Sequence, residues 1–567
     1  MITLICHETQ ITVAQEFFEL FKVPWSLPDQ GVDSAVILVC GSLEVPDGGD
    51  LVIAFGSEES EFDRQHGIKV NPRSGLTAPL MMDGLPPLYR GGVNVSMPPA
   101  GSIDADGSTE LVGVAKFSGR TVIRVGWDLL EEVRYLLVEG QPVEFANRPT
   151  LDEHIDLIRS WIVAAGVPLV EVPPQPSGYP FTVCLSHDVD FLGIRHHLFD
   201  RTIIGFVLRA LLPTFFGHGG GKVSLSDYLR NIAAVLQLPL IALGVKKDFL
   251  NKLSRYSELE EKMGSTFFMI PYKNEPGCQM PAGISDPSPP GWRAARYDIK
   301  DYSGELKRLA QKGHEISLHG LDAWCDPEKG RRELETVRTI IGDEKVGVRM
   351  HWLYYNHHTL EILEQAGFDY DSTVGYNDSI GFRSGTAQAY RMPGSADILE
   401  LPLIVQDTAM FFRKRMALTE KAAAVKCAEL VDAIQGSGGV FTVNWHQRSI
   451  APERNWERFY RDLLSGLKSR RPWFATCARA VGWFRMRRRI RFEYQTTVDG
   501  RSLLRIIHTG KEGVPEPVLR RYRPGSGMIK DIKRAAVPEF DDEVLTGSTK
   551  VQPWKEPEMK PLEERVL

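Results

Sequence analysis

Apolar and polar positions between residues 181 and 485 repeat as short apolar runs separated by longer amphipathic segments. Two of the amphipathic segments, 302–313 and 357–367, end on a glycine, as helices commonly do. Repeated strand–helix units predict a parallel sheet, either open or closed into a barrel. The predicted strands are 181–187, 265–271, 314–320, 345–351, 368–374, 398–404 and 438–446.

The flanking regions have a different pattern. Residues 1–150 contain short apolar runs, such as "SAVILVCGSL" and "LVIAFG", and are predicted to form a separate α/β domain. Residues 151–180 end in the proline-rich run "EVPPQPSGYP" and are predicted to be a linker. Beyond the barrel, "VDGRS" indicates a hairpin within a small β extension at 486–530, and 531–567 is expected to be a loosely ordered tail.

Two strongly apolar segments interrupt the strand–helix pattern after the first predicted strand. They are "TIIGFVLRALLPTFFG" at 202–217 and "NIAAVLQLPLIALGV" at 231–245, within an insertion near 200–250. Neither reaches the roughly 18 uninterrupted apolar residues of a spanning helix. Two interpretations stay open: a buried helical hairpin, or a surface at 202–245 that enters the membrane interface.

Polar side chains that can do chemistry gather at the ends of the predicted strands. In parallel α/β folds the active site lies at the carboxyl ends of the strands, so these residues are expected to meet. They are His187, Asp188 and Asp190 after the first strand, His319 after the third, Arg349 and His351 after the fourth, Asp371 in the fifth and His446 after the seventh.

The pair Asp188 and Asp190 indicates a metal ligand beside a general base. A carboxylate bound to a divalent cation loses basicity, so its neighbour must stay unbound to accept a proton from a water that the metal acidifies. A histidine across the barrel mouth then protonates the leaving group, and His446 on the last strand is the candidate.

Bulk composition limits the class of protein. The 567 residues predict two or three domains, and a net charge of −6 gives no basic surface for nucleic acid. The N-terminus lacks the features of a secretory signal, and seven single cysteines without a CxxC motif predict a reducing compartment. We therefore expect a cytoplasmic protein, in contact with the membrane only if the apolar insertion lies in it. The sequence indicates no oligomeric state.

The motifs resemble those of the polysaccharide deacetylase or NodB-homology family, carbohydrate esterase family 4. "SHDVD", "GHEISLHG", "VRMHW" and "FTVNWH" occur in the family's order, with "STFFMIP" and "AGFDYDST" between them, over roughly 181–485. The resemblance implies a distorted seven-stranded (β/α) barrel that binds a divalent metal, zinc by expectation. It further implies the roles of five residues: Asp188 as base, Asp190 and His319 as metal ligands, Arg349 as the residue that orients the base, and His446 as acid.

One departure from the family concerns the third metal ligand. Ala323 stands where the family has a second ligand histidine, and His351 stands where the family commonly has proline. We expect His351 to be the missing ligand, with its nitrogen within about 5 Å of a nitrogen of His319, because both would lie about 2 Å from one ion. Asp322 is the weaker candidate, and a site with only two ligands is the remaining alternative. Arg383 and Trp352 are the expected substrate-binding residues.

The leading hypothesis is a metal-dependent hydrolase that removes N-acetyl groups from an amino sugar of a glycan or glycan precursor. One alternative is an amide hydrolase acting on a small nitrogenous compound, and another is a sugar-binding barrel that lost its metal. The presence of Asp188, Arg349 and His446 favours an enzyme, because a binding module needs neither a base nor an acid.

Overall fold

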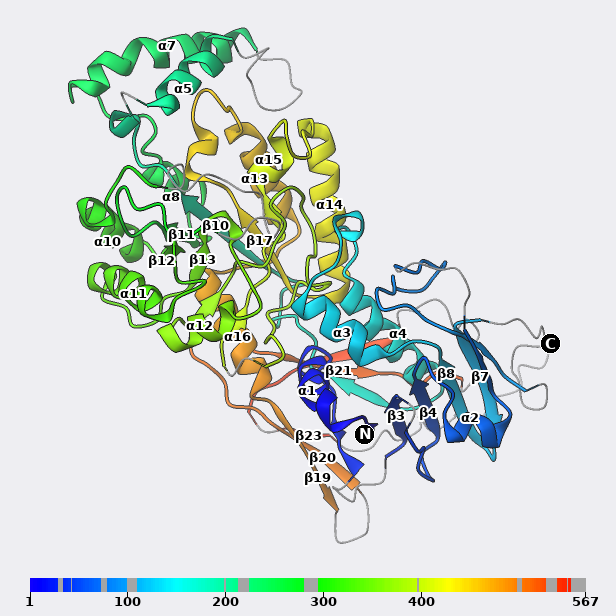
Figure 1. Cartoon of the computed structure of the whole chain (residues 1–567). Helices are drawn as coiled ribbons and strands as arrows, with labels where there is room; N and C mark the ends of the chain where they lie inside the picture. The colour runs from blue at the N-terminus through cyan, green and yellow to red at the C-terminus, as the bar shows by residue number, and fades with distance from the viewer. Residues whose placement is uncertain are drawn as a thin grey trace, which may run out of the picture.

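The computed structural model describes most of the chain (Figure 1). The described residues are 1–28, 34–41, 43–72, 79–98, 110–197, 200–212, 224–279, 294–394, 397–496, 502–526, 538–547 and 549–551.

The N-terminal domain is built on a six-stranded sheet. Its order is β2 (Trp25–Ser26), β1 (Ile2–Ile5), β3 (Val36–Cys40), β4 (Leu51–Phe55), β8 (Arg120–Val125) and β7 (Val112–Phe117), and only the pair β7–β8 is antiparallel. The helices are α1 (Ile11–Leu20), α2 (Glu61–His66) and α3 (Leu129–Val138), with 3₁₀ turns at Glu8–Gln10 and Val143–Phe145 and a small hairpin of β5 (Lys69–Asn71) and β6 (Asn94–Ser96). The predicted strands 36–40 and 51–55 are therefore central in this sheet.

The range 151–180, predicted to be a linker, holds regular structure. Helix α4 spans Thr150–Ala164 and strand β9 spans Leu169–Glu171. Leu151, Ile155, Ile158 and Ile162 repeat at helical spacing, and all four are buried in the core of the N-terminal domain. The prolines that indicated a linker occupy only the last part of the range, so the N-terminal domain extends through β9.

The second domain is built on a parallel sheet that curls into a half-barrel, which confirms the barrel-type α/β fold predicted from the motifs, with eight strands along the sheet where seven were expected. In spatial order its strands are β14 (Tyr370–Asp371), β13 (Val348–Met350), β12 (Glu315–Gly320), β11 (Ser265–Met269), β10 (Thr182–Val189) and β17 (Val440–Asn444). One segment supplies both edges of the sheet: its first part, β15 (Leu399–Glu400), pairs with β14, and its last part, β16 (Val405–Gln406), pairs with β17. A short outer strand, β18 (Trp473–Phe474), also pairs with β10.

Helices surround this sheet, and their apolar sides form the main core with it. They are α8 (Leu253–Leu259), α10 (Ser303–Gln311), α11 (Pro327–Ile341), α12 (Thr359–Ala366), α13 (Asp407–Phe411), α14 (Glu420–Ser437) and α15 (Glu457–Ser469). Helix α16 (Cys477–Arg488) packs in a separate core cluster with residues of β10, β11, β14, β15 and β17. Further 3₁₀ turns span Ile194–His197, Ile299–Tyr302, His351–Leu353 and Gln447–Ile450.

The apolar insertion forms two helices, α5 (Arg201–Leu211) and α7 (Leu225–Ala242), at the end of the molecule opposite the N-terminal domain (Figure 1). Their inner sides pack on the barrel through Phe206 and Leu238. Their outer sides are exposed, so the interpretation as a hairpin buried on all sides is wrong. Only the side of each helix that faces the barrel is buried. The helices are apolar on two sides, and sequence alone does not tell which side is covered. Residues 213–223 between them, which include Phe215 and Phe216, lie outside the described residues.

None of the described helices is both long enough and apolar enough to span a bilayer.

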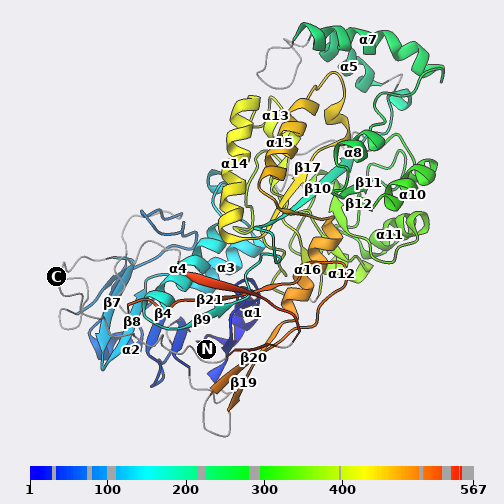
Figure 2. The same cartoon turned by 180° about the vertical axis from the view of Figure 1, so that it is seen from behind.

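The C-terminal region joins the two domains. Strands β19 (Arg491–Thr496) and β20 (Ser502–Ile507) pair antiparallel, as the predicted hairpin requires. Strand β21 (Val518–Tyr522) pairs with β9 of the N-terminal domain, and the two lie side by side in Figure 2. The predicted loose tail contains β22 (Phe540–Val544), which extends that sheet, and β23 (Thr549–Val551), which pairs with β20. Residues 552–567 are outside the described part.

A buried arginine on α16 holds the domains against each other. The guanidinium of Arg487 donates hydrogen bonds to the carbonyl oxygens of Glu19, Leu20 and Val172, each at 2.9 Å. These acceptors belong to the N-terminal domain and to the segment that leads into the barrel. Because buried carbonyl groups need a donor, Arg487 is expected to contribute strongly to the interface.

We predict that Arg487→Met lowers the free energy of unfolding by at least about 3 kcal/mol, because three buried carbonyl oxygens lose a charged donor. Urea unfolding followed by tryptophan fluorescence measures the change. The control is Arg489→Met, two residues later on an exposed position. Equal stability of the two variants would contradict the role given to Arg487.

Candidate active site

The alternation of side chains along β10 separates two kinds of polar residue. Successive side chains of a strand point to opposite sides, so Asp188 and Asp190 share one side and His187 takes the other. His187 is fully buried, with Nε2 3.0 Å from Glu260 and Nδ1 2.8 Å from the carbonyl oxygen of Trp445. It is a packed core residue, whereas the two aspartates reach the barrel mouth.

Asp188 has both carboxylate oxygens engaged by protein donors. Arg349 Nη1 donates to Oδ1 at 3.0 Å, and Asn444 Nδ2 donates to Oδ2 at 2.7 Å. Burial alone would raise the pKa of this carboxyl, but the neighbouring His319 and the charge of Arg349 outweigh it and lower the pKa below its ordinary value. Asp188 is therefore ionised and fixed in orientation.

Arg349 is itself held from three sides at the centre of the barrel. It is fully buried, and its guanidinium donates to Ser186 Oγ at 2.8 Å and to the carbonyl and hydroxyl oxygens of Ser372 at 2.9 and 3.0 Å. Its Cζ lies 4.3 Å from the ring centroid of Phe268. These contacts tie strand β13 to β10, β11 and the end of β14, and they fix the position of Asp188.

Asp190, His319 and His351 form a candidate metal site. One ligand atom from each lies within 4.8 Å of the others, which meets the geometry expected for His319 and His351. Asp190 Oδ1 lies 3.4 Å from His319 Nε2 and 3.5 Å from His351 Nε2. Two ligands at about 2 Å from a tetrahedral ion lie about 3.3 Å apart, so the distances from Asp190 to the two histidines fit a divalent cation.

The surroundings of these ligands also fit a cation. His319 Nδ1 lies 2.9 Å from the carbonyl oxygen of Arg349, which can only accept, so Nδ1 carries the proton and Nε2 offers its lone pair. Asp190 Oδ1 is buried and has no hydrogen-bond donor among the described residues, unlike the oxygens of Asp188. Burial would raise the pKa of Asp190, but the neighbouring His319 and His351 outweigh burial and lower it, which keeps the carboxylate ionised.

The chain turns sharply immediately after His351. Trp352 and Leu353 have φ values of 65° and 53°, in the left-handed region that non-glycine residues rarely adopt. Asn377 Nδ2 supports the turn by donating to the carbonyl oxygen of Trp352 at 3.0 Å. The strained backbone directs His351 and Trp352 into the same cavity.

The weaker ligand candidate, Asp322, lies elsewhere. Its Oδ1 accepts from the backbone N–H of Cys278 at 2.5 Å, and its Oδ2 lies 3.3 Å from Lys329 Nζ. It belongs to a separate group of metal-ligating side chains with Cys278 and Cys325. Ala323 is fully buried in the barrel core, where it packs against Gly330.

His446 is oriented by a carboxylate that we did not predict. Asp407 is fully buried, with Oδ1 2.6 Å from His446 Nδ1 and Oδ2 accepting from the backbone N–H of His446 at 2.7 Å. Burial would lower the pKa of His446, but the charge and hydrogen bond of Asp407 outweigh burial and raise it. The imidazolium is therefore stabilised, with Nε2 left to face the cavity.

These groups line a cavity of about 230 Å³. Trp352 lies on its wall, as expected for a substrate-binding residue. Its lining is completed by Phe191, Leu353, Asn377, Gln406, Thr408, Phe412, Arg415, Arg448 and Arg454.

Arg383 is not among the residues that line this cavity, and its predicted substrate role is corrected. Its Nη1 donates to the carbonyl oxygen of Gly375 at 2.9 Å, and its side chain lies against Gly140 of the N-terminal domain. Its backbone carbonyl accepts from Gln141 N–H at 2.7 Å. The long segment between β14 and β15 carries Arg383 to the domain interface, which a local sequence pattern does not reveal.

Asp371, another strand-end carboxylate, has a structural role. It is fully buried and accepts hydrogen bonds from the backbone of Ser372 at 2.9 Å and from Thr373 Oγ1 at 2.5 Å. Burial beside Glu400 raises the pKa of Asp371 to about 6 and that of Glu400 well above its ordinary value. The two carboxyls share a buried site, and neither lines the cavity that holds Asp188, Asp190 and His446.

Two residues of the site were missed in the sequence. Asn444 lies two positions before His446, on the same side of β17, and Asp407 directly follows β16. The rule that polar residues at strand ends form the site would have found Asp407 if the sixth strand had been extended by two residues. Asn444 carried no signal, because an asparagine in an apolar strand fits many structural roles.

No family model matches the chain. A peptidoglycan deacetylase of Helicobacter pylori is 24% identical over 98 residues, which are 16% of this chain and 33% of that protein. The match thus spans about a third of the length of the curated relative.

Among solved structures, a Mycobacterium smegmatis protein assigned as a polysaccharide deacetylase is similar to 55% of this chain and 94% of its own, at 19% identity and a TM-score of 0.34. Agd3, a carbohydrate deacetylase, is similar over 92% of this chain and 90% of its own, at 10% identity and a TM-score of 0.30. The match to the peptidoglycan deacetylase confirms the resemblance drawn from the motifs: the chain is similar to polysaccharide deacetylases.

Proposed function

We propose that the protein is a metal-dependent hydrolase that removes N-acetyl groups from an amino sugar of a glycan or glycan precursor. The observation that carries the proposal is the unequal state of the two aspartates. Asp188 has a protein donor on each oxygen, whereas Asp190 presents a buried, unsatisfied oxygen to His319 and His351. This is the division into base and metal ligand that amide hydrolysis requires.

Asp190, His319 and His351 would hold the metal, and the two histidines with one carboxylate favour zinc. A divalent cation at this position would acidify a bound water and polarise the carbonyl oxygen of the acetamido group. The two proton transfers of the reaction are carried out by Asp188 and His446.

Asp188 takes the proton of the attacking water. Arg349 and Asn444 keep its carboxylate ionised and aimed at the mouth, so no reorganisation is needed when the proton arrives. Its lowered pKa matches a base that must be ionised before the reaction begins.

His446 donates a proton to the departing amine. Its Nδ1 hydrogen bonds to Asp407, which fixes the ring and stabilises the charged form until the proton is given up from Nε2. The base and the acid come from β10 and β17, which are neighbouring paired strands, so the two side chains enter the mouth next to each other rather than from opposite walls of the barrel.

The cavity dimensions favour a small reacting group. About 230 Å³ is below the roughly 300–1,000 Å³ of ordinary ligand pockets, which fits an acetamido group and its sugar ring with the rest of the glycan outside. Trp352 offers an aromatic face at the mouth for the ring. The intact acid and base pairs argue against a sugar-binding barrel without catalysis.

We predict that Asp188→Asn lowers kcat/KM for acetate release by roughly 1,000-fold or more while the protein keeps its metal, because only the base is lost. Asp190→Asn and His351→Ala should lose both metal and activity, since three protein ligands are the usual minimum for catalytic zinc. Acetate release from N-acetylated oligosaccharides and metal content by mass spectrometry are the two measurements.

Asp462→Asn, on an exposed position of α15, is the matched control and should change neither quantity. Loss of metal in Asp188→Asn together with retention in Asp190→Asn would reverse the two roles. Full metal content in His351→Ala would remove that residue from the ligand set.

A second prediction concerns pH. Because Asp407 raises the pKa of His446, the protonated acid is present below that pKa and activity is lost as pH rises through it. Asp407→Asn removes the raising influence, so the basic limb of the kcat profile should move to lower pH and kcat should fall by about 100-fold. A basic limb that stays in place in this variant would exclude His446 as the acid.

A further inference from the structure

The outer sides of α5 and α7 form an apolar surface that nothing in the described part of the chain covers. On α7 the exposed residues Leu225, Leu229, Leu236, Leu240 and Leu243 follow helical spacing and form one stripe, with exposed fractions of 44–76%. On α5 the stripe is continued by Ile204, Leu208 and Leu211. We call these eight residues the outer face.

The concentration of apolar residues here exceeds that of the remaining surface. Of the 16 large hydrophobic side chains that are exposed in the described residues, 10 lie between Ile204 and Val245. Contiguous apolar surface of this kind marks a site of interaction with a protein or a membrane. The inner sides of the same helices supply the packing of the insertion on the barrel, so the outer face is not required for that packing.

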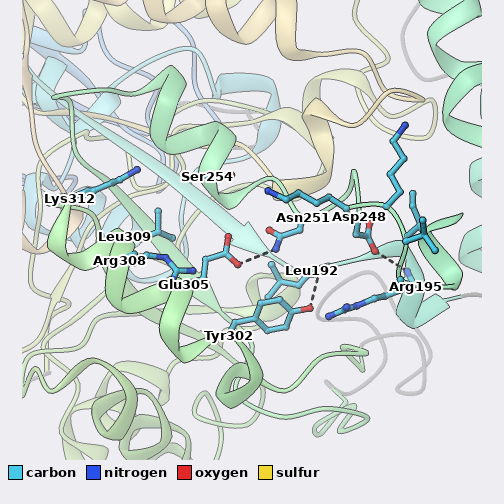
Figure 3. Close-up of a pocket in the computed structure, with 15 residues that line it drawn as sticks. Leu192, Arg195, Asp248, Asn251, Ser254, Tyr302, Glu305, Arg308, Leu309 and Lys312 are labelled. Carbon is cyan, nitrogen blue, oxygen red and sulfur yellow. Dashed lines mark hydrogen bonds between the residues drawn. The ribbon is translucent and has the colours of Figure 1, made fainter. Parts of the chain in front are cut away.

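A basic cavity adjoins the C-terminal end of α7. It has a volume of about 620 Å³, and Figure 3 shows Arg195, Arg308 and Lys312 around it. Lys246 and Lys247, in the segment after α7, also line it; both are exposed and form no ion pair with the described residues.

The two acidic residues of this cavity are already occupied. Asp248 accepts from the backbone N–H of Arg195 at 3.0 Å and from that of Leu250 at 3.0 Å. Glu305 accepts from Asn251 Nδ2 at 3.1 Å. Five basic side chains face two acidic ones, so the cavity has an excess of positive charge.

We propose that the outer face docks on an anionic lipid bilayer, with the leucines in the interface and the basic cavity against lipid phosphate groups. An apolar helix surface bordered by lysine and arginine has the composition of interfacial helices, and each basic residue near an anionic leaflet adds to the attraction. A second copy of the chain fits less well, because a two-fold contact through this face would bring two basic edges together.

The same end of the molecule carries the candidate active site. The insertion packs on Ile194, which follows β10, and on Ala451, which follows β17. Both strands deliver active-site residues at their carboxyl ends, so a docked molecule would hold the cavity mouth close to the lipid surface. The docking proposal goes beyond the hydrolase function and does not depend on it.

The test is co-sedimentation of the full chain with vesicles of phosphatidylcholine alone or mixed with phosphatidylglycerol. We expect binding to the anionic vesicles that weakens with added salt. Leu229→Asp/Leu236→Asp should lower the bound fraction at least about tenfold, because two side chains that leave water on docking would carry charges. Lys246→Glu/Lys247→Glu should lower it about tenfold on anionic vesicles.

Matched controls come from exposed positions elsewhere. Val143→Asp/Val425→Asp places the same charges on exposed valines, and Lys69→Glu/Lys116→Glu reverses two exposed lysines of the N-terminal domain; neither should affect binding. Circular dichroism and the thermal midpoint show that each variant is folded.

Absence of vesicle binding by the wild type would overturn the proposal. So would equal binding to both vesicle types that Lys246→Glu/Lys247→Glu does not weaken. A dimer in size-exclusion chromatography that Leu229→Asp/Leu236→Asp dissociates would also overturn it, since a second copy would then cover the outer face. None of these readouts involves acetate release, so failure here is distinguishable from failure of the proposed hydrolase function.

Discussion

A single buried cation, Arg349, sets the geometry on which the candidate site depends. Its guanidinium has no contact with solvent, and its charge is balanced by Asp188 and shared with oxygens of Ser186 and Ser372. A charge in a protein interior is tolerated only with such partners, so the strands that supply them are held in one register. The same contact keeps Asp188 ionised and leaves Asp190 as the carboxylate available to a metal.

The site is completed from strands far apart in sequence. The candidate ligand His351 stands where the family that the motifs resemble commonly has proline, and a left-handed turn at Trp352 and Leu353 directs it inward. His446 is prepared by Asp407 in the same way as Asp188 is prepared by Arg349: a buried partner of opposite charge fixes both orientation and protonation state. Acid, base and candidate ligands thus each rely on a second residue behind them.

Several features were predictable from local pattern. The seven strands, the hairpin after residue 485 and the meeting of strand-end residues all follow from apolar periodicity and from the rule that parallel strands end on one side of a sheet. The prediction of a linker at 151–180 was wrong because it rested on the prolines at the end of the range. The helical spacing of Leu151 and Ile155, which indicates a helix, was not used. The tail contains β22 and β23 because these segments pair with β21 and β20 at the edges of the C-terminal sheets. A polar strand at the edge of a sheet lacks the run of apolar residues by which a strand is predicted from sequence.

The sequence by itself determined which chemical groups are present and on which side of each strand they lie, because side chains alternate with a period of two. It therefore placed Asp188 with Asp190, and the comparison with the family's motifs made His351 the candidate for the third ligand. Only the tertiary structure decided what each of these groups contacts. Asn444 contacts the proposed base, and Asp407 contacts the proposed acid. Arg383 lies against Gly140 instead of the cavity, and one side of α7 faces solvent instead of the core. Those outcomes depend on which distant segments pack together, and that packing is a property of the whole chain rather than of any local pattern.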